Sequence, residues 1–177
     1  VGAGTFQPVR TSDIAHHTMH CERFSVTGET IENLLANHGK IIAVGTTSVR
    51  TLESLYWLGV KIIADRSMQN DGYKVSQWEP YGEDPGISVK ESLGALKSRM
   101  SDKNVNELEA STSMIIVPGY RFRMIEGMIT NFHQPRSTLL LLVSAWTGND
   151  WKKIYGYALD NGFRFLSYGD GSLLINQ

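Results

Sequence analysis

The sequence predicts an α/β domain in which a mostly parallel sheet is flanked by helices. Short apolar runs suited to strands alternate with stretches whose apolar residues recur at helical spacing. The run KIIAV at residues 40–44 is apolar throughout, which is typical of a strand buried on both faces. The run STLLLLVSAW at residues 137–146 is apolar on nearly every face of a helix, so we expect that helix to be deeply buried.

The elements follow from these patterns and from residues that favour helix ends. Strands are expected at the short apolar runs, at residues 1–10, the later part of 16–26, 40–44, 60–64, 113–117, 124–130 and 163–168. Helices are expected at residues 30–37, 48–58, 89–100, 137–146 and 150–161. Gly39, Gly59 and Gly162 each follow a helical stretch and can end it, and Ser88 with Glu91 forms a capping box. The polar residues 66–86 are the expected long loop.

The composition fits one globular domain. The chain has 177 residues, of which 41% are hydrophobic and 20% are charged, without long runs of one sign. A chain of this size buries roughly 70% of its unfolded surface, which is enough for a stable core. The formal net charge of -1 does not favour nucleic-acid binding, because contacts to phosphates come from Lys and Arg. An RNA partner would therefore need a local patch or surfaces outside this chain.

Cysteine usage and hydropathy indicate the compartment. A single cysteine, Cys21, excludes an internal disulfide and indicates a reducing, cytoplasmic setting. The longest apolar run, residues 138–146, is far below the roughly 18 residues that a membrane-spanning helix needs, so no membrane partner is expected. No signal peptide is visible, and Val1 falls within a strand-like segment, so we expect the chain to start inside a larger protein. We expect a monomer.

The sequence HTMHCE is the first stretch that could carry chemistry. Its side chains His17, His20 and Glu22 could bind a metal or transfer protons. In an extended backbone, His20 and Glu22 lie on the same face. A zinc site needs three or four ligands, which His133 or Asp170 would have to complete. The alternative is a solvated turn with incidental histidines.

The turn GTTSVR joins the 40–44 strand to the next helix. Its candidate ligand-binding residues are Gly45, Thr46, Thr47, Ser48 and Arg50. Open α/β sheets bind ligands at this position, beyond the carboxyl ends of strands. The N–H groups and hydroxyls at a helix N-terminus suit a carboxylate or a phosphate, and a guanidinium adds a fixed positive charge. The alternative is simple capping of the helix by the hydroxyl side chains.

Two later polar turns take similar positions. Asn131 and His133 lie between a strand and the buried helix, where they could hydrogen-bond a purine edge or a ribose. Tyr168 and Asp170 follow the last expected strand, although Gly-Asp-Gly is also common in ordinary turns. All of these turns must converge at one edge of the sheet if they form a single site.

The stretches together resemble the S-adenosylmethionine:tRNA ribosyltransferase-isomerases of queuosine biosynthesis. In order along the chain, the resemblance is carried by VGAGTFQPV, H-x-M-H-x-E, AVGTTSVRTLES, TNFH-x-P-x-STLLLLVSA and RFLSYGDG. It covers residues 1–58 and 112–175, whereas residues 59–110 are a less familiar insertion with a loop and one helix. It implies that residues 1–177 are a single α/β domain, the C-terminal portion of a two-domain enzyme whose N-terminal part and inserted β-barrel are absent here.

The resemblance also implies a reaction. The ribosyl group of S-adenosylmethionine is transferred to 7-aminomethyl-7-deazaguanine in tRNA and isomerised, which gives epoxyqueuosine-tRNA, adenine and methionine. S-adenosylmethionine is then a consumed co-substrate, tRNA is the partner, and no metal or other cofactor is implied. The proton transfers require groups with pKa values near neutral. The catalytic candidates are His17, His20, Glu22 and His133; the substrate-binding candidates are Gly45, Thr46, Thr47, Ser48, Arg50, Asn131, Tyr168 and Asp170.

Two alternative functions stay open at this point. A metal-dependent hydrolase would use His17, His20 and Glu22 as ligands. A non-catalytic module would bind a nucleotide or RNA through the same polar turns without releasing adenine.

Overall fold

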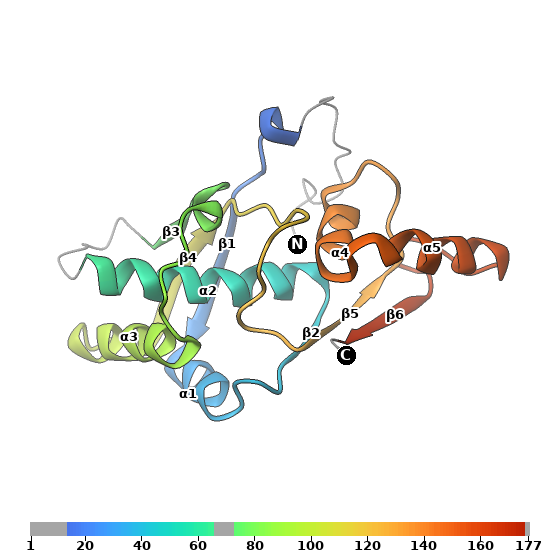
Figure 1. The fold of residues 1–177 in the computed structure, drawn as a ribbon. Helices are drawn as coiled ribbons and strands as arrows, with labels where there is room; N and C mark the ends of the chain where they lie inside the picture. Colours follow the sequence, from blue (N-terminus) through green and yellow to red (C-terminus); the bar gives the residue numbers. More distant parts are fainter. Residues whose placement is uncertain (1–13, 66–72, 176–177) are drawn as a thin grey trace.

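The computed structural model describes residues 14–65 and 73–175, which form two three-stranded sheets connected by a long helix (Figure 1). The helices are α1 (Gly28–Ala36), α2 (Thr46–Ala64), α3 (Val89–Asp102), α4 (Thr138–Thr147) and α5 (Trp151–Asp160). The strands are β1 (Glu22–Thr27), β2 (Ile42–Val44), β3 (Lys74–Val75), β4 (Glu107–Thr112), β5 (Gly127–Asn131) and β6 (Gly171–Ile175). Short 3-10 turns occupy Ile14–His16, Glu79–Tyr81 and Gly148–Asp150. The strand expected over residues 1–10 lies outside the described residues.

The expectation of one mostly parallel sheet is wrong, although the α/β class is confirmed. Sheet A has the order β1-β4-β3, with β1 antiparallel and β3 parallel to β4. Sheet B has the order β2-β5-β6, with β2 parallel and β6 antiparallel to β5. Parallel neighbours need a crossover that returns the chain to its starting end. After α4 and α5, the chain instead returns to the carboxyl end of β5, where Gly171 pairs with Asn131. Strand β6 therefore runs antiparallel to β5.

Helix α2 continues through the region where a strand was expected at residues 60–64. Gly59 is not a helix stop: a Cβ added to it would lie 2.2 Å from the carbonyl oxygen of Ser92 in α3. The glycine therefore permits the close crossing of α2 and α3, which Ser92 reinforces by donating from Oγ to Tyr56 O at 2.6 Å. Both faces of α2 are largely buried, including Leu55 and Leu58, so it forms the centre of the core.

Two other expected strands are absent from the described residues at their expected positions. Residues 113–117 are irregular, although Ser113 N and Ile115 N still donate to Val75 O and Gln77 O. Side chains satisfy other backbone groups of this segment. Arg50 Nε donates to Met114 O, Tyr81 Oη donates to Ile115 O, and Val117 N donates to Tyr81 Oη. Residues 163–168 form a turn, and the last strand begins only at Gly171.

The helices with clear end signals match the expectations closely. The Ser88–Glu91 capping box is confirmed, with both of its hydrogen bonds formed at the start of α3. Helix α4 is buried as expected, including Leu140, Leu142 and Val143. None of the described helices combines the length and the apolar character needed to cross a bilayer.

Candidate functional site at the carboxyl ends of β2 and β5

Three of the four polar turns meet at one edge of sheet B. The parallel pairing aligns Val44 with Ile129, and Gly45 N donates to Ile129 O at 2.8 Å. The antiparallel pairing aligns Asn131 with Gly171. We call this edge the rim, defined by residues 45–48, 130–133 and 168–170. The side chain of Asn131 holds two of its turns together by donating from Nδ2 to Gly169 O at 3.3 Å and to Asp170 O at 3.4 Å.

The first turn of α2 opens onto the rim without a capping side chain. Its N-cap is Gly45, whose φ of 87° suits glycine, and within the described part of the chain no side chain caps the helix there. The N–H groups at the start of a helix have no acceptor within the helix, and the helix dipole adds positive potential. Thr46 is buried, while Thr47 and Ser48 are half-buried. This turn therefore keeps donors suited to an anion.

The first polar stretch reaches the same helix through Glu22. Its Oε1 accepts from His20 Nε2 at 2.6 Å and from Arg50 Nη1 at 3.0 Å. We call these three residues the Glu22 cluster. Arg50 lies in the first turns of α2, so the cluster lies against the helix that begins at the rim. Because an ionised carboxylate can only accept, His20 donates to it from Nε2.

Arg50 is the most buried member of the cluster. Its side chain is 4% exposed, and burial lowers its pKa while the neighbouring Glu22 carboxylate opposes that effect. Its Nε donates to Met114 O, but its Nη2 is buried and has no hydrogen-bond partner among residues 14–65 and 73–175. A buried donor without a partner costs about 1–3 kcal/mol. An anionic group placed beside Nη2 would remove that cost.

His17 and the turn around it are held by a residue that the sequence did not suggest. The side chain of Gln77 donates from Nε2 to His17 O at 2.5 Å and accepts from Met19 N at 2.8 Å. Gln77 lies in the expected 66–86 loop, about 60 residues away, so no local pattern could reveal it. Across residues 14–65 and 73–175, no group of three or more His, Cys, Asp or Glu side chains is placed to hold a metal ion.

His133 does not have the near-neutral pKa that was expected of a catalytic acid or base. Its Nε2 lies 2.8 Å from Thr130 Oγ1, and its backbone N donates to Tyr155 Oη at 3.0 Å. Burial lowers the pKa of His133 to about 4, so the ring is uncharged at neutral pH. This imidazole can therefore act as a fixed hydrogen-bonding group at the rim, not as an acid with a pKa near 7.

The two C-terminal candidates, Tyr168 and Asp170, have contrasting surroundings. The Asp170 carboxylate accepts from Arg164 N at 2.7 Å and from Arg164 Nη2 at 3.3 Å. These bonds close the turn that leads into β6, and they lower the pKa of Asp170. Tyr168, at the tip of the same turn, is 98% exposed. The carboxylate that was expected to bind substrate is thus engaged within the turn.

Glu53 is a second buried acid that the sequence did not single out. It is fully buried on α2 and accepts from Met124 N at 2.9 Å, Arg123 N at 3.0 Å and Tyr120 Oη at 2.8 Å. Burial raises the pKa of Glu53 to about 7. The sequence did contain one indication that Glu53 is buried, because it lies four residues after Val49 and so on the apolar face of the helix. It fixes the segment that leads into β5.

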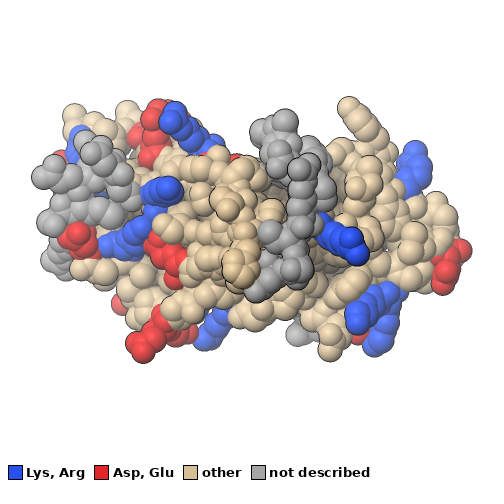
Figure 2. Space-filling view, turned by 90° about the horizontal axis from the view of Figure 1, so that it is seen from above, with Lys and Arg blue, Asp and Glu red and all other residues tan. Residues whose placement is uncertain are grey.

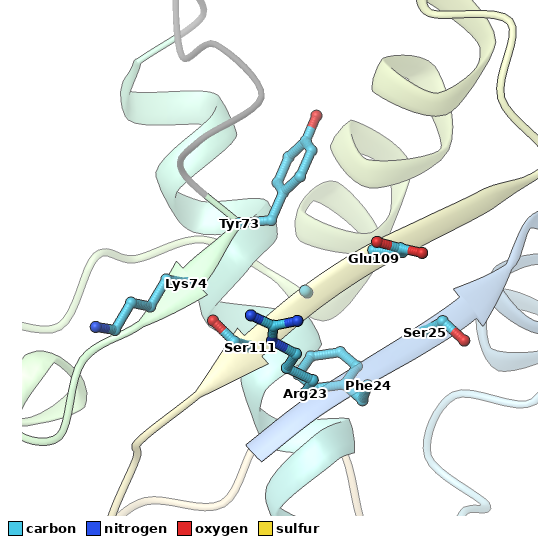
Figure 3. A pocket seen from close by; sticks show the side chains of 8 residues that line it. Arg23, Phe24, Ser25, Tyr73, Lys74, Glu109 and Ser111 are labelled. Carbon is cyan, nitrogen blue, oxygen red and sulfur yellow. The ribbon is translucent and has the colours of Figure 1, made fainter. Parts of the chain in front are cut away.

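A separate hollow of about 540 Å³ lies on the solvent face of sheet A (Figure 3). Residues that line it include Arg23, Ser25, Lys74, Glu109 and Ser111. Side chains alternate across a strand, so Arg23 faces this hollow whereas its neighbour Glu22 turns to the Glu22 cluster. In Figure 3 the Arg23 guanidinium leans over Ser111, while Lys74 points away from it. The hollow is therefore distinct from the rim.

On the face seen in Figure 2, Lys and Arg lie beside Asp and Glu in the left part of the view, whereas the charged groups on the right are fewer, mostly basic and separated by uncharged surface. This distribution agrees with the net charge of -1. It gives RNA no broad basic area on that part of the described surface.

Comparison with known proteins places these motifs in a family. A family model described as "Queuosine biosynthesis protein" matches residues 1–174. The S-adenosylmethionine:tRNA ribosyltransferase-isomerases of Azoarcus sp. and Nitrosomonas europaea are each 38% identical to the chain over 181 residues, and that of Burkholderia mallei is 39% identical. These matches span 100% of the chain and 39–40% of each relative.

A solved structure gives the same result. The crystal structure of S-adenosylmethionine tRNA ribosyltransferase from Thermotoga maritima superimposes with a TM-score of 0.53 at 30% identity. The match covers 86% of this chain and 40% of that chain. The chain thus spans about 40% of the length of these relatives. The family match over residues 1–174 shows that the chain belongs to the queuosine biosynthesis protein family.

Proposed function

We propose that this chain supplies part of the active site of an S-adenosylmethionine:tRNA ribosyltransferase-isomerase. The complete enzyme transfers the ribosyl group of S-adenosylmethionine to 7-aminomethyl-7-deazaguanine in tRNA and isomerises it, releasing adenine and methionine. The observation that carries the proposal is the convergence of the family's polar motifs at the rim and at the Glu22 cluster beside it. Because the substrate is tRNA, the reaction takes place in the cytoplasm, where the exposed Cys21 stays reduced.

In this proposal the chain is one α/β domain, the C-terminal portion of a larger enzyme. In it, an N-terminal part and an inserted β-barrel lie outside this chain, which matches 40% of the Azoarcus sp. relative. Residues 59–110 belong to the same domain, since α3 packs on α2 and β4 pairs with β1. S-adenosylmethionine is a consumed co-substrate, and the chemistry needs no metal.

The reaction needs a base for the acceptor amine, a base for the carbon beside the sulfonium, and a proton for the departing adenine. His20 is the base in the Glu22 cluster, because Glu22 orients its ring and the side chain stays partly exposed. Glu22 also neutralises Arg50, so it acts as a positioning residue.

The rim holds the substrate in this proposal. The open N–H groups of α2 and the hydroxyls of Thr47 and Ser48 bind the methionine carboxylate. Neutral His133 hydrogen-bonds adenine or the ribose, and Asn131 fixes the turn that carries Tyr168. Each of these groups is held by contacts to the sheet, which favours a rigid site.

The test uses a full-length chimera in which residues 1–177 replace the matched part of the Burkholderia mallei relative. The chimera is mixed with S-adenosylmethionine and acceptor tRNA, and free adenine is measured by chromatography. We expect adenine to appear only when both substrates are present. We expect His20→Gln to lower the rate about 100-fold or more, in line with the loss of a general base. The matched control is His38→Gln, because His38 is exposed in the loop before β2, away from the rim.

Two results would count against the proposal. A normal adenine rate in His20→Gln would remove His20 from the chemistry. Binding of S-adenosylmethionine and tRNA without any adenine release would indicate a binding module instead of an enzyme.

A further inference from the structure

One face of sheet B exposes a set of aliphatic side chains. Ile42, Val44, Ile129, Leu173 and Ile175 are 40–66% exposed. We call this set the aliphatic face. It contains no charged side chain, and its members come from all three strands of the sheet.

The strand register makes the aliphatic face continuous. Val44, Ile129 and Leu173 form one row across the sheet, because Ile129 is paired with both of the others. Ile42 and Ile175 are both paired with Gly127, so they form the next row on either side of a residue without a side chain. The exposed residues therefore lie next to one another and are not scattered.

The opposite face of the same strands is already the core side. Ala43, Met128 and Leu174 alternate with the aliphatic residues and are buried. A sheet that is apolar on both faces is typical of one covered on both faces. Large contiguous apolar patches on a protein surface mark interaction sites. The aliphatic face thus has the composition of an interface, although the described residues leave it uncovered.

The family match indicates what covers it. The chain accounts for 39–40% of each relative, which leaves about 60% of each relative's chain outside the match. The Thermotoga maritima structure leaves the same share of its chain unmatched. We propose that the aliphatic face is the docking surface for this remaining part of the family's polypeptide, which meets it through an apolar, uncharged surface of its own.

The position of the aliphatic face adds a consequence. Val44 and Ile129 directly precede Gly45 and Thr130, which belong to the rim. A segment that packs on the aliphatic face therefore borders the rim and contributes side chains to the ligand site. This consequence rests on the proposed function, whereas the docking itself does not.

The test measures the reactivity of single cysteines toward a thiol reagent, in the 177-residue chain and in the chimera, with Cys21→Ser as background. Val44→Cys reports on the aliphatic face. Ala43→Cys, on the buried face of the same strand, reports on folding, and Ser25→Cys, exposed on sheet A, reports on intrinsic reactivity. We expect Val44→Cys to react as fast as Ser25→Cys in the shorter chain. In the chimera we expect it to react at least tenfold more slowly, with Ser25→Cys unchanged.

Other outcomes overturn the docking proposal. Equal reactivity of Val44→Cys and Ser25→Cys in a folded chimera would show that nothing covers the face. Protection in the shorter chain that grows with protein concentration would identify a second copy as the occupant. Protection there at every concentration would show that the chain covers its own face. If the shorter chain does not fold, the comparison of Val44→Cys with Ser25→Cys within the chimera decides alone.

A second measurement covers failure of the chimera to fold. In the shorter chain, the triple variant Val44→Thr, Ile129→Thr and Leu173→Thr should bind less of a hydrophobic dye than the parent. Equal dye binding by the folded parent and the folded variant would show that these side chains are not an accessible apolar surface, against the proposal. Neither measurement needs substrate, so the docking and the proposed function can fail separately. Adenine release by a chimera in which Val44→Cys is reactive would reject only the docking. A protected Val44→Cys in a chimera that releases no adenine would reject only the function.

Discussion

Glu22 Oε1 lies 3.0 Å from Arg50 Nη1 in an ion pair whose two side chains are only 11% and 4% exposed. The pair joins the first strand of sheet A to the helix that starts at the rim. Because Glu22 Oε1 also contacts His20 Nε2, the pair fixes the position of His20 relative to that helix.

We expect Glu22→Gln to lower the free energy of unfolding by about 3 kcal/mol, because Arg50 would lose the carboxylate that it pairs with in a buried setting. Arg50→Met should cost a similar amount, and the double variant should cost clearly less than the sum. Urea unfolding of the four proteins measures this coupling. The exposed pair of Lys97 and Glu32 is the control, and its cycle should give less than about 1 kcal/mol. Strict additivity at Glu22 and Arg50 would contradict the prediction.

Glu53 should make the chain less stable as the pH rises. Its pKa is raised from 4.5 to about 7 on folding, so the protonated form is favoured in the folded chain. The resulting stability is fully present below pH 4.5 and is lost as the pH rises through 7, by about 3 kcal/mol in total. Glu53→Gln should remove this dependence. Chemical unfolding at pH 5 and pH 8 for both proteins checks it, and an equal pH dependence in parent and variant would contradict it.

His133 should act in the opposite direction. Its pKa is lowered from 6.5 to about 4, so the neutral ring is favoured in the folded chain. Its contribution is present above pH 6.5 and is lost as the pH falls through 4, by about 3 kcal/mol in total. His133→Asn should flatten the stability profile between these pH values while leaving the Glu53 contribution intact. The measurement is unfolding by urea at pH 7 and pH 4.5, where a parallel fall in both proteins would exclude the assignment.

The crossing of α2 and α3 gives a prediction with an internal control. Gly59→Ala should destabilise the chain by at least about 2 kcal/mol, because its Cβ would collide with the Ser92 backbone at 2.2 Å. Gly94→Ala, also in a helix, meets no atom within 4 Å and should stabilise by about 0.5–1 kcal/mol. Thermal melting of the two variants distinguishes them. Similar melting temperatures would show that the helices can move apart without cost.

The elements predictable from the sequence were those with local end signals. Ser88 and Glu91 are three residues apart and cap α3 through their own hydrogen bonds, so its start needed no tertiary information. The predicted helix end at Gly59 was wrong because the reason for this glycine lies in a partner 33 residues away. Its missing Cβ permits the contact with Ser92, and the helix continues past it. The order and direction of strands likewise depend on which runs pair, which composition does not determine.

The site was predictable to the same extent. The carboxyl-end rule for strands correctly brought the turns after β2 and β5 together, because it depends only on strand direction. The roles of Gln77 and Glu53 could not be predicted, since their partners lie 58–71 residues away. The low pKa of His133 also required coordinates, because it arises from burial and not from a neighbouring charge.

Helix α2 contacts strands of both sheets: β3 and β4 of sheet A, and β2 and β5 of sheet B (Figure 1). Its buried residues are spread along its whole length, from Thr46 to Ile62. Unfolding of either sheet would expose apolar side chains of this helix to solvent, so we expect both sheets to unfold in a single cooperative transition. Heat and denaturant should therefore reveal one all-or-none melting event, monitored equally by Trp57 near the middle of the helix and by Trp146 on α4.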